Sequence, residues 1–268
     1  MTRTRRTAIV ALLLVYVAVR VFWWYDGQQL TGLGRLVGAL GLVKVGAWVI
    51  PVVLVVALTH RARLRDALAF LGLAGNRLAA LRFGLYATLP MAFAVAFAGP
   101  ARLDPVVIAG TVLIGPFAEE VLFRGFLLKT LLADARWSVG WAIAVSAAAF
   151  GAAHIPDLDL KTLGNLYQLT AHHDELARQR LLSMAFDLAT MGAGGVVFGW
   201  VFYRLGSLWP AIALHGYLNL WRTLAEGDPR PETHVDAVAI AQTASFVLAI
   251  LLTLRWRPVV SSPSPARP

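Results

Sequence analysis

Two adjacent glutamates and an arginine lie deep inside an apolar stretch, and their types and spacing give the first indication of chemistry. Glu119 and Glu120 stand fourteen residues into that stretch, and Arg124 follows them. Placing a charged side chain at membrane depth costs on the order of several kcal/mol of free energy, so such residues are usually functional. Glu120 and Arg124 are four apart, so they share a helix face and can pair. Glu119 is rotated by about 100° from Glu120, has no local counter-charge, and can serve as a general base.

Two histidines and an asparagine stand in later apolar stretches. His154 ends the run Phe150-Gly-Ala-Ala-His154, and Asn219 follows His215 by four residues, so the last two share a helix face. A single histidine inside a membrane is more often a packing or hydrogen-bonding residue. Four polar groups on three helices at about one depth, however, indicate a site, and these groups are Glu119, His154, His215 and Asn219.

The depths of Glu119 and His154 are similar when each is counted along its own helix. At 1.5 Å per residue, Glu119 lies about 20 Å from Leu132, and His154 lies about 24 Å from Ser138. The connection between the two helices is short, so they should be antiparallel neighbours. We therefore expect Glu119 and His154 to meet.

The composition predicts that the elements carrying these residues are membrane helices. The chain has 268 residues, of which 58% are hydrophobic and only 15% are charged. Soluble domains are about 45–50% apolar and about a quarter charged, and burial in a soluble core saturates with size. The excess apolar surface has to face lipid. The chain contains no cysteine, which excludes disulfides, cysteine nucleophiles and cysteine-ligated zinc.

The expected fold is all-α, a polytopic bundle of about eight transmembrane helices, because runs of about 20 apolar residues recur between charged or Gly/Pro-rich breaks. The first run follows Arg3, Arg5 and Arg6, lacks a clear cleavage site, and is expected to be a retained helix rather than a signal peptide. The eight predicted spans are Thr7–Trp24, Leu36–Thr59, Phe83–Ala98, Pro105–Leu132, Ser138–His154, Leu181–Tyr203, Leu208–Leu224 and Val235–Leu254.

The distribution of basic residues predicts the orientation. With the N-terminus in the cytosol, the eight spans leave fourteen Lys and Arg residues on the cytosolic side and seven on the other. This asymmetry follows the positive-inside rule and places both termini in the cytosol. The net charge of +9 is thus a topology signal, and we expect no nucleic-acid partner. The predicted location is the plasma membrane, as a multi-pass protein.

The three polar segments resemble the motifs of the CAAX prenyl endopeptidase and bacteriocin-processing (CPBP, or Abi) family of intramembrane proteases. Its motifs E-E-x-x-x-R, F-x-x-x-H and H-x-x-x-N occur here in the same order, as Glu119-Glu120-x-x-x-Arg124, Phe150-x-x-x-His154 and His215-x-x-x-Asn219. Each motif is short, but three in order within membrane spans are fairly specific. The expected organisation is a catalytic core at 83–224, preceded by helices and a basic loop at 1–82 and followed by a last helix and tail at 225–268.

The resemblance implies roles for these residues in peptide hydrolysis. Glu119 and His154 would activate a water, and His215 and Asn219 would stabilise the oxyanion. Glu120 and Arg124 would support the shape of the site. The substrate would be a membrane-associated or membrane-tethered protein or peptide. No cofactor is favoured, although zinc is possible, and Glu119, His154 and His215 would then be its ligands.

Some features have more than one interpretation. Lys44 can contact substrate, but we expect it to snorkel or to pair with a neighbouring helix. Asp187 either lines a cavity or lies at the membrane interface. We expect the glycines at 192–199 to permit close helix packing, and the segment Ile155–Arg180 to be a solvated loop. The whole chain can also be read as a non-enzymatic membrane protein, such as an immunity or scaffold protein or a transporter, although no internal repeat typical of transporters is found.

Overall fold

The computed structural model describes residues 3–26, 42–60, 62–96, 105–154, 175–226 and 231–254. Within these ranges all regular structure is helical and no strand is formed. The all-α prediction is confirmed in this part of the chain. The predicted loop Ile155–Arg180 is wrong at its end, because residues 175–180 already belong to the long helix Glu175–Leu205. The rest of that segment, 155–174, the predicted C-terminal tail at 255–268 and the side chain of Asp187 lie outside the described residues.

The helices follow the apolar runs of the sequence, and three π-helical segments (η1 to η3) lie within them. The first half of the chain contains α1 (Arg3–Asp26), α3 (Leu42–Lys44), η1 (Val45–Val49), α4 (Ile50–Thr59), α5 (Leu64–Phe70), α6 (Arg77–Ala87) and α7 (Leu89–Val95). The second contains α8 (Pro105–Ile108), η2 (Ala109–Ile114), α9 (Gly115–Glu120), η3 (Val121–Leu128), α10 (Lys129–Ala133), α11 (Val139–Ala153), α13 (Glu175–Leu205), α14 (Trp209–Glu226) and α15 (Pro231–Leu254).

Prolines explain where several of these helices change geometry. Pro51 lies two residues after the end of η1, in the first turn of α4, and Pro116 lies two residues after the end of η2, in the first turn of α9. A proline lacks the backbone N–H and crowds the carbonyl four residues earlier, and the wider π-turn before it relieves this contact. Pro90 opens α7, where the chain bends by 56° after α6. The described part of the predicted span Phe83–Ala98 therefore lies on a bent pair of helices.

Three described helical segments are long and apolar enough to cross a membrane: Leu42–Thr59, Leu188–Leu205 and Ala237–Leu254. The bent pair of α6 and α7 makes a fourth if it counts as one span. The helices Arg6–Val19 and Val139–Ala153 are apolar but shorter. By length and composition, then, the described residues supply three or four candidate spans of a membrane protein.

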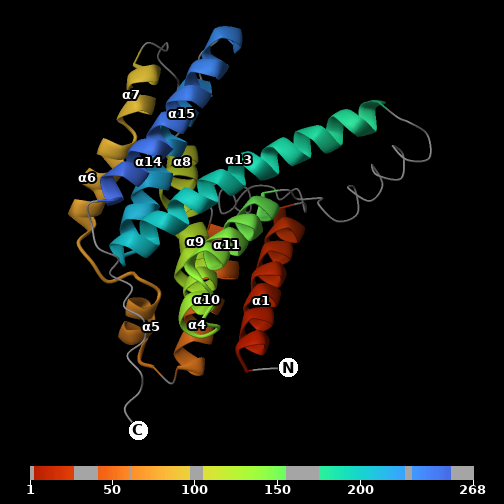
Figure 1. The fold of residues 1–268 in the computed structure, drawn as a ribbon, viewed down its shortest axis with the longest axis vertical. Coiled ribbons are helices and arrows are strands. Elements are labelled where there is room, and N and C mark those ends of the chain that lie inside the picture. The colour runs from red at the N-terminus through yellow and green to blue at the C-terminus, as the bar shows by residue number, and fades with distance from the viewer. Residues whose placement is uncertain are drawn as a thin grey trace.

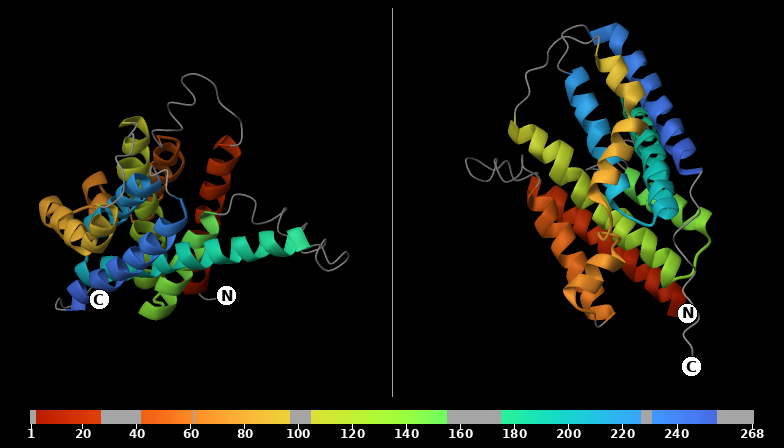
Figure 2. Two further views of the ribbon diagram at one scale, coloured as in Figure 1. Left: turned by 90° about the horizontal axis from the view of Figure 1, so that it is seen from above. Right: turned by 90° about the vertical axis from the view of Figure 1, so that its left-hand side faces the viewer.

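The helical segment formed by α9 and η3 lies at the centre of the structure, and every residue of η3 is buried. Helices α1, α4, α11 and α13 all contact η3, although they come from distant parts of the chain (Figures 1 and 2). The early part of α13 extends past the other helices in Figure 1, and its Leu182 and Phe186 are exposed. The motif that contains Glu119, Glu120 and Arg124 is thus held on all sides by other helices.

Glycines allow two of these helix pairs to approach closely. A Cβ at Gly195 would lie 2.9 Å from the Cα of Ala147 in α11. A Cβ at Gly84 in α6 would lie 2.8 Å from the carbonyl carbon of Ala213 in α14. Gly195 belongs to the predicted small-residue stripe, and it packs α13 against α11 as that prediction states.

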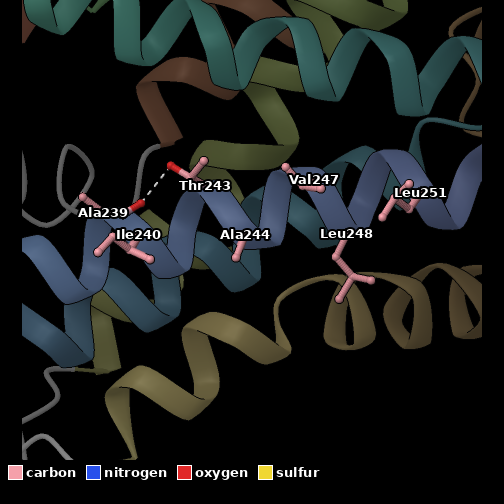
Figure 3. Close-up of a pocket in the computed structure, with 7 residues that line it drawn as sticks. All are labelled: Ala239, Ile240, Thr243, Ala244, Val247, Leu248 and Leu251. Atoms are coloured by element: carbon pink, nitrogen blue, oxygen red, sulfur yellow. Dashed lines mark hydrogen bonds between the residues drawn. The ribbon is translucent and has the colours of Figure 1, made fainter.

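An open apolar groove of about 640 Å³ runs along α15 (Figure 3). Its lining residues are Ala239, Ile240, Thr243, Ala244, Val247, Leu248 and Leu251. None of them carries a titratable side chain, and the groove contains none of the predicted site residues. It cannot provide the chemistry that the polar motifs indicate.

Candidate active site

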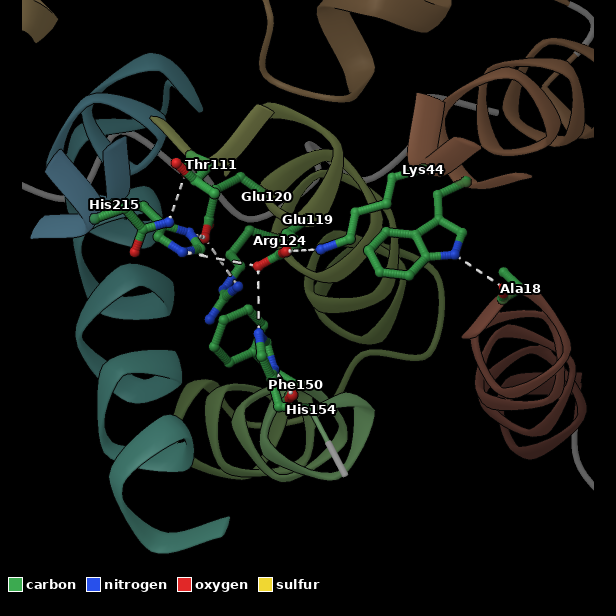
Figure 4. Close-up of polar contacts among 11 residues, drawn as sticks. Ala18, Lys44, Thr111, Glu119, Glu120, Arg124, Phe150, His154 and His215 are labelled. Atoms are coloured by element: carbon green, nitrogen blue, oxygen red, sulfur yellow. Dashed lines mark hydrogen bonds and ion pairs between the residues drawn. The ribbon is translucent and has the colours of Figure 1, made fainter. Parts of the chain in front are cut away.

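The carboxylate of Glu119 is contacted from three other helical segments (Figure 4). Its Oε1 lies 2.5 Å from Nζ of Lys44, which ends α3. Its Oε2 lies 3.5 Å from Nε2 of His154 at the end of α11 and 3.7 Å from Nε2 of His215 in α14. Glu119 is only 5% exposed. The predicted meeting of Glu119 with His154 therefore occurs, and His215 joins them.

The hydrogen bonds of the two histidines fix which ring nitrogen carries a proton. Nδ1 of His154 lies 2.8 Å from the Phe150 carbonyl oxygen, which can only accept, so this Nδ1 donates. Nδ1 of His215 lies 3.0 Å from Oε1 of Glu120, an oxygen that also accepts from Arg124, so it donates as well. In a neutral ring each Nε2 then carries the lone pair. Both Nε2 atoms face Oε2 of Glu119.

Glu120 and Arg124 form the predicted i,i+4 ion pair, and both are fully buried. Nη1 of Arg124 donates to Oε1 of Glu120 at 3.0 Å, and Nη2 donates to the Gly195 carbonyl of α13 at 3.2 Å. The guanidinium also lies 4.2 Å from the ring centroid of Phe150. Arg124 thereby joins η3 to α11 and α13, while Glu120 holds His215.

Phe198 of α13 completes the wall behind His215. The two rings are stacked with centroids 4.7 Å apart and an interplanar angle of 14°. Phe150 meets His215 edge-on, with centroids 5.9 Å apart. These aromatic contacts and the bond to Glu120 fix the orientation of the His215 ring.

Asn219 lies one helical turn from His215, and no contact with Glu119 is formed among the described residues. Its Nδ2 donates to the Thr111 carbonyl oxygen of η2 at 2.8 Å. Gly216 permits this approach, because a Cβ there would lie 2.5 Å from the Val112 carbonyl oxygen. The structure therefore brings Glu119, His154 and His215 together and places Asn219 beside them, bound to η2.

Lys44 also belongs to this site, and its partner residue could not be predicted from the sequence. Pairing with a neighbouring helix was expected, and the partner is Glu119, 75 positions later in the chain. The available signal was a single lysine within the apolar run Leu36–Thr59. Such a residue needs a polar partner, but its sequence neighbours do not reveal which one.

The residues do not form a metal site in this arrangement. Within the described ranges, no group of three His, Cys, Asp or Glu side chains is placed so that it could hold a metal ion. In addition, Oε1 of Glu119 already contacts the Lys44 ammonium. A divalent ion on Oε2 would lie close to that positive charge, which opposes its binding.

Comparison with known proteins identifies a similar family. Residues 101–221 match the family model described as Type II CAAX prenyl endopeptidase Rce1-like. No curated protein and no solved structure matches the chain. The matched region contains all three motifs, including Glu119, His154 and His215, and it ends two residues after Asn219.

The family match and the apolar helices agree with the resemblance carried by the motifs. The matched family is a family of proteases, and the described helices include three or four candidate membrane spans. Through residues 101–221, this chain is thus similar to the Rce1-like type II CAAX prenyl endopeptidase family, in agreement with the family that the three motifs indicate.

Proposed function

We propose that the chain is an intramembrane endopeptidase that hydrolyses a peptide bond in a membrane-associated or membrane-tethered protein. The observation that carries this proposal is the position of Glu119 Oε2, which faces Nε2 of both His154 and His215 at 3.5 and 3.7 Å. A buried carboxylate beside two oriented imidazoles is suited to activating a water. The family match supports the same class of reaction.

In the proposed reaction, Glu119 and His154 orient and activate the water. Both Oε2 of Glu119 and Nε2 of neutral His154 accept hydrogen bonds, so one water can donate a hydrogen to each. Glu119 takes a proton while the water oxygen bonds to the peptide carbonyl carbon, and the carbonyl π electrons move to its oxygen. When the intermediate collapses, the C–N bond breaks and the leaving nitrogen takes the proton from Glu119.

His215 and Asn219 are proposed to stabilise the negative oxygen of the intermediate. Nδ1 of His215 already donates to Glu120, so a second donor at Nε2 requires the doubly protonated ring. The amide of Asn219 has two N–H groups, and the bond to Thr111 uses one. Donors of this kind act strongly in a pocket of low dielectric constant. Glu120 and Arg124 support the site by holding His215 and the surrounding helices.

The proposed mechanism is metal-free, and it predicts that chelators leave activity unchanged. The physical reason is the Lys44 ammonium on Glu119, which occupies the place of a second cation. The measurement is elemental analysis of the purified chain together with hydrolysis rates before and after treatment with a chelator. Stoichiometric zinc, with activity lost on its removal and restored by its return, would instead favour a metalloprotease with Glu119, His154 and His215 as ligands.

We also propose eight membrane spans, with both termini in the cytosol of a plasma-membrane protein. The support is the positive-inside asymmetry of the sequence and the helices found in the described part of each predicted span. The proposed catalytic core is 83–224, which includes the family-matched region. The segments 1–82 and 225–268 would then add helices around this core.

A comparison of membrane peptides in living cells tests the proposed function. Cells that lack the gene should accumulate an uncleaved membrane-associated protein, and wild-type chain should restore its cleavage. His154→Ala should fail to restore cleavage at equal abundance in the membrane, because the water then loses one of its two acceptors. The measurement is mass spectrometry of membrane proteins and their fragments.

Full restoration by His154→Ala would support the non-enzymatic alternative. An immunity or scaffold protein would use the polar cluster only to hold its helices together, and its function would depend on folding alone. A matched control is His60→Ala, since His60 lies outside the cluster and contacts Phe70 and Asp134 instead. This variant should restore cleavage as the wild type does.

A further inference from the structure

Lys44 contacts the proposed catalytic base, although it lies outside the family-matched region 101–221. It comes from α3, at the start of the segment Leu42–Thr59. Figure 4 shows its side chain approaching Glu119 from the side opposite to His215. The site therefore includes a charged residue from the N-terminal part of the chain.

We propose that Lys44 is a positioning residue that fixes the carboxylate of Glu119 for catalysis. The inference rests on the proposed function, because it assigns a role within that reaction. By binding Oε1, the ammonium leaves Oε2 directed toward the two histidines. The N-terminal helices would then contribute to catalysis and would not merely surround the family core.

A glutamate side chain needs such a partner to hold a defined orientation. Rotation about its terminal torsion is broad and roughly two-fold, so the side chain by itself does not fix the plane of the carboxylate. The contacts of Oε2 are 3.5 and 3.7 Å long, whereas the Lys44 contact with Oε1 is 2.5 Å long. Lys44 is thus the closest contact that holds Glu119 in its plane.

Lys44 is itself held in place by aromatic packing. Trp48 lies four residues later on the same face, and its ring centroid is 5.2 Å from Nζ of Lys44. The Trp48 ring is fixed in turn, because Nε1 donates to the Ala18 carbonyl of α1 at 2.9 Å and the ring meets Phe123 edge-on. A cation above a tryptophan face is favourable. Helix α1 therefore supports Lys44, which in turn supports Glu119.

The charge of Lys44 also suits the group it contacts. Glu119 is 5% exposed, and a buried carboxylate without a nearby cation is costly. Arg124 is bonded to Glu120 and to Gly195, whereas the Lys44 ammonium contacts Glu119 directly. The Lys44 side chain is 21% exposed, so it reaches the base from the edge of the buried cluster.

Kinetics of Lys44→Met test this role, since methionine keeps much of the length and removes the charge and the N–H donors. The probe is an internally quenched peptide with a prenylated CAAX end, and the enzyme is the full chain in lipid nanodiscs. We expect kcat to fall roughly tenfold to hundredfold, as for other small misplacements of a reacting group, with KM nearly unchanged. Lys44→Arg should restore most of kcat, because it returns a cation to Oε1.

The matched control is Lys129→Met, which makes the same substitution at a second lysine in an apolar environment. Nζ of Lys129 lies 4.8 Å from the ring centroid of Phe70, away from Glu119, so this variant should keep the wild-type kcat. Folded fractions are compared by thermal unfolding. Should Lys44→Met fail to fold, Lys44→Gln, which keeps an N–H donor on a shorter side chain, carries the same expectation.

Three results would overturn the positioning role. One is a kcat for Lys44→Met within threefold of the wild type, and another is no recovery in Lys44→Arg. The third is a rise in KM with kcat unchanged, which would make Lys44 a substrate contact. Glu119→Gln, measured in parallel, distinguishes failure of the positioning role from failure of the proposed function. If Glu119→Gln is inactive and Lys44→Met has the wild-type kcat, only the positioning role fails. An active Glu119→Gln would overturn both.

Discussion

Glu119→Gln is expected to reduce the rate of peptide hydrolysis roughly 10²- to 10⁴-fold, which is the usual contribution of a general base. Glutamine has nearly the same shape, so the helices around it should pack as before. Its amide, however, cannot take a proton from water. Oε2 of Glu119 faces the two histidines and Oε1 faces Lys44, so the substitution changes the centre of the cluster. The measurement is kcat for the prenylated peptide, with the folded fraction determined for each variant.

Glu175→Gln is a suitable control for this substitution. Glu175 begins α13, is exposed, and pairs only with Arg178 among the described contacts. It should therefore keep the wild-type rate. An active Glu119→Gln would show that the cluster is structural and would favour the scaffold or immunity interpretation. The expected pattern is a folded, inactive Glu119→Gln beside a folded, active Glu175→Gln.

Arg124→Met is expected to lower the free energy of unfolding by about 3–5 kcal/mol, the cost of removing one partner from a buried ion pair. Glu120 would keep its charge at a position that is 0% exposed, with His215 as its remaining partner. The variant would also lose the bond to the Gly195 carbonyl, which joins η3 to α13. Reversible unfolding in mixed detergent micelles measures this change.

Two further variants make the Arg124 result specific. Arg178→Met removes one partner of an exposed ion pair, so it should cost only about 0–1 kcal/mol. The double variant Glu120→Gln with Arg124→Met removes the uncompensated charge and should be more stable than Arg124→Met alone, which a double-mutant cycle quantifies. Equal losses of stability for Arg124→Met and Arg178→Met would contradict the assigned role of the buried pair.

The buried pair is better explained by positioning than by stability. Oε2 of Glu120 and Nε of Arg124 are buried without a hydrogen-bond partner among the described residues, and each such atom carries a desolvation cost. A pair of well-packed apolar residues would often be as stable. What apolar residues could not provide is the acceptor for Nδ1 of His215, which fixes the proton of that ring.

The two adjacent glutamates differ because a helix turns by about 100° per residue. Glu120 faces Arg124 on its own helix, and both groups are fully buried. Glu119 faces other helices, where it meets Lys44 and two histidines whose Nε2 atoms face its carboxylate. One carboxylate is thus bound in a salt bridge that orders the site, and the other directs one oxygen toward the imidazoles.

The sequence by itself determined the class of structure and most members of the cluster. The composition predicts membrane helices, because its apolar surface exceeds what a soluble core can bury. The described residues are helical. The spacing of Glu120 and Arg124 specifies an ion pair, because residues four apart on a helix are neighbours, and the pair is present. Counting residues along the two antiparallel helices predicted that Glu119 and His154 lie at a similar depth, and their side chains do meet.

Only the tertiary structure decided which long-range partners these residues have. The contact of Lys44 with Glu119 joins positions 75 apart, and the bond from Asn219 to Thr111 joins positions 108 apart. Local periodicity places a side chain on a helix face, but it does not specify which helix packs against that face. That choice depends on close contacts such as Gly195 against Ala147 and on the 56° bend before α7. That Glu119, His154 and His215 gather in one cluster is consistent with the sequence, whereas the atom that each one faces could not be predicted from it.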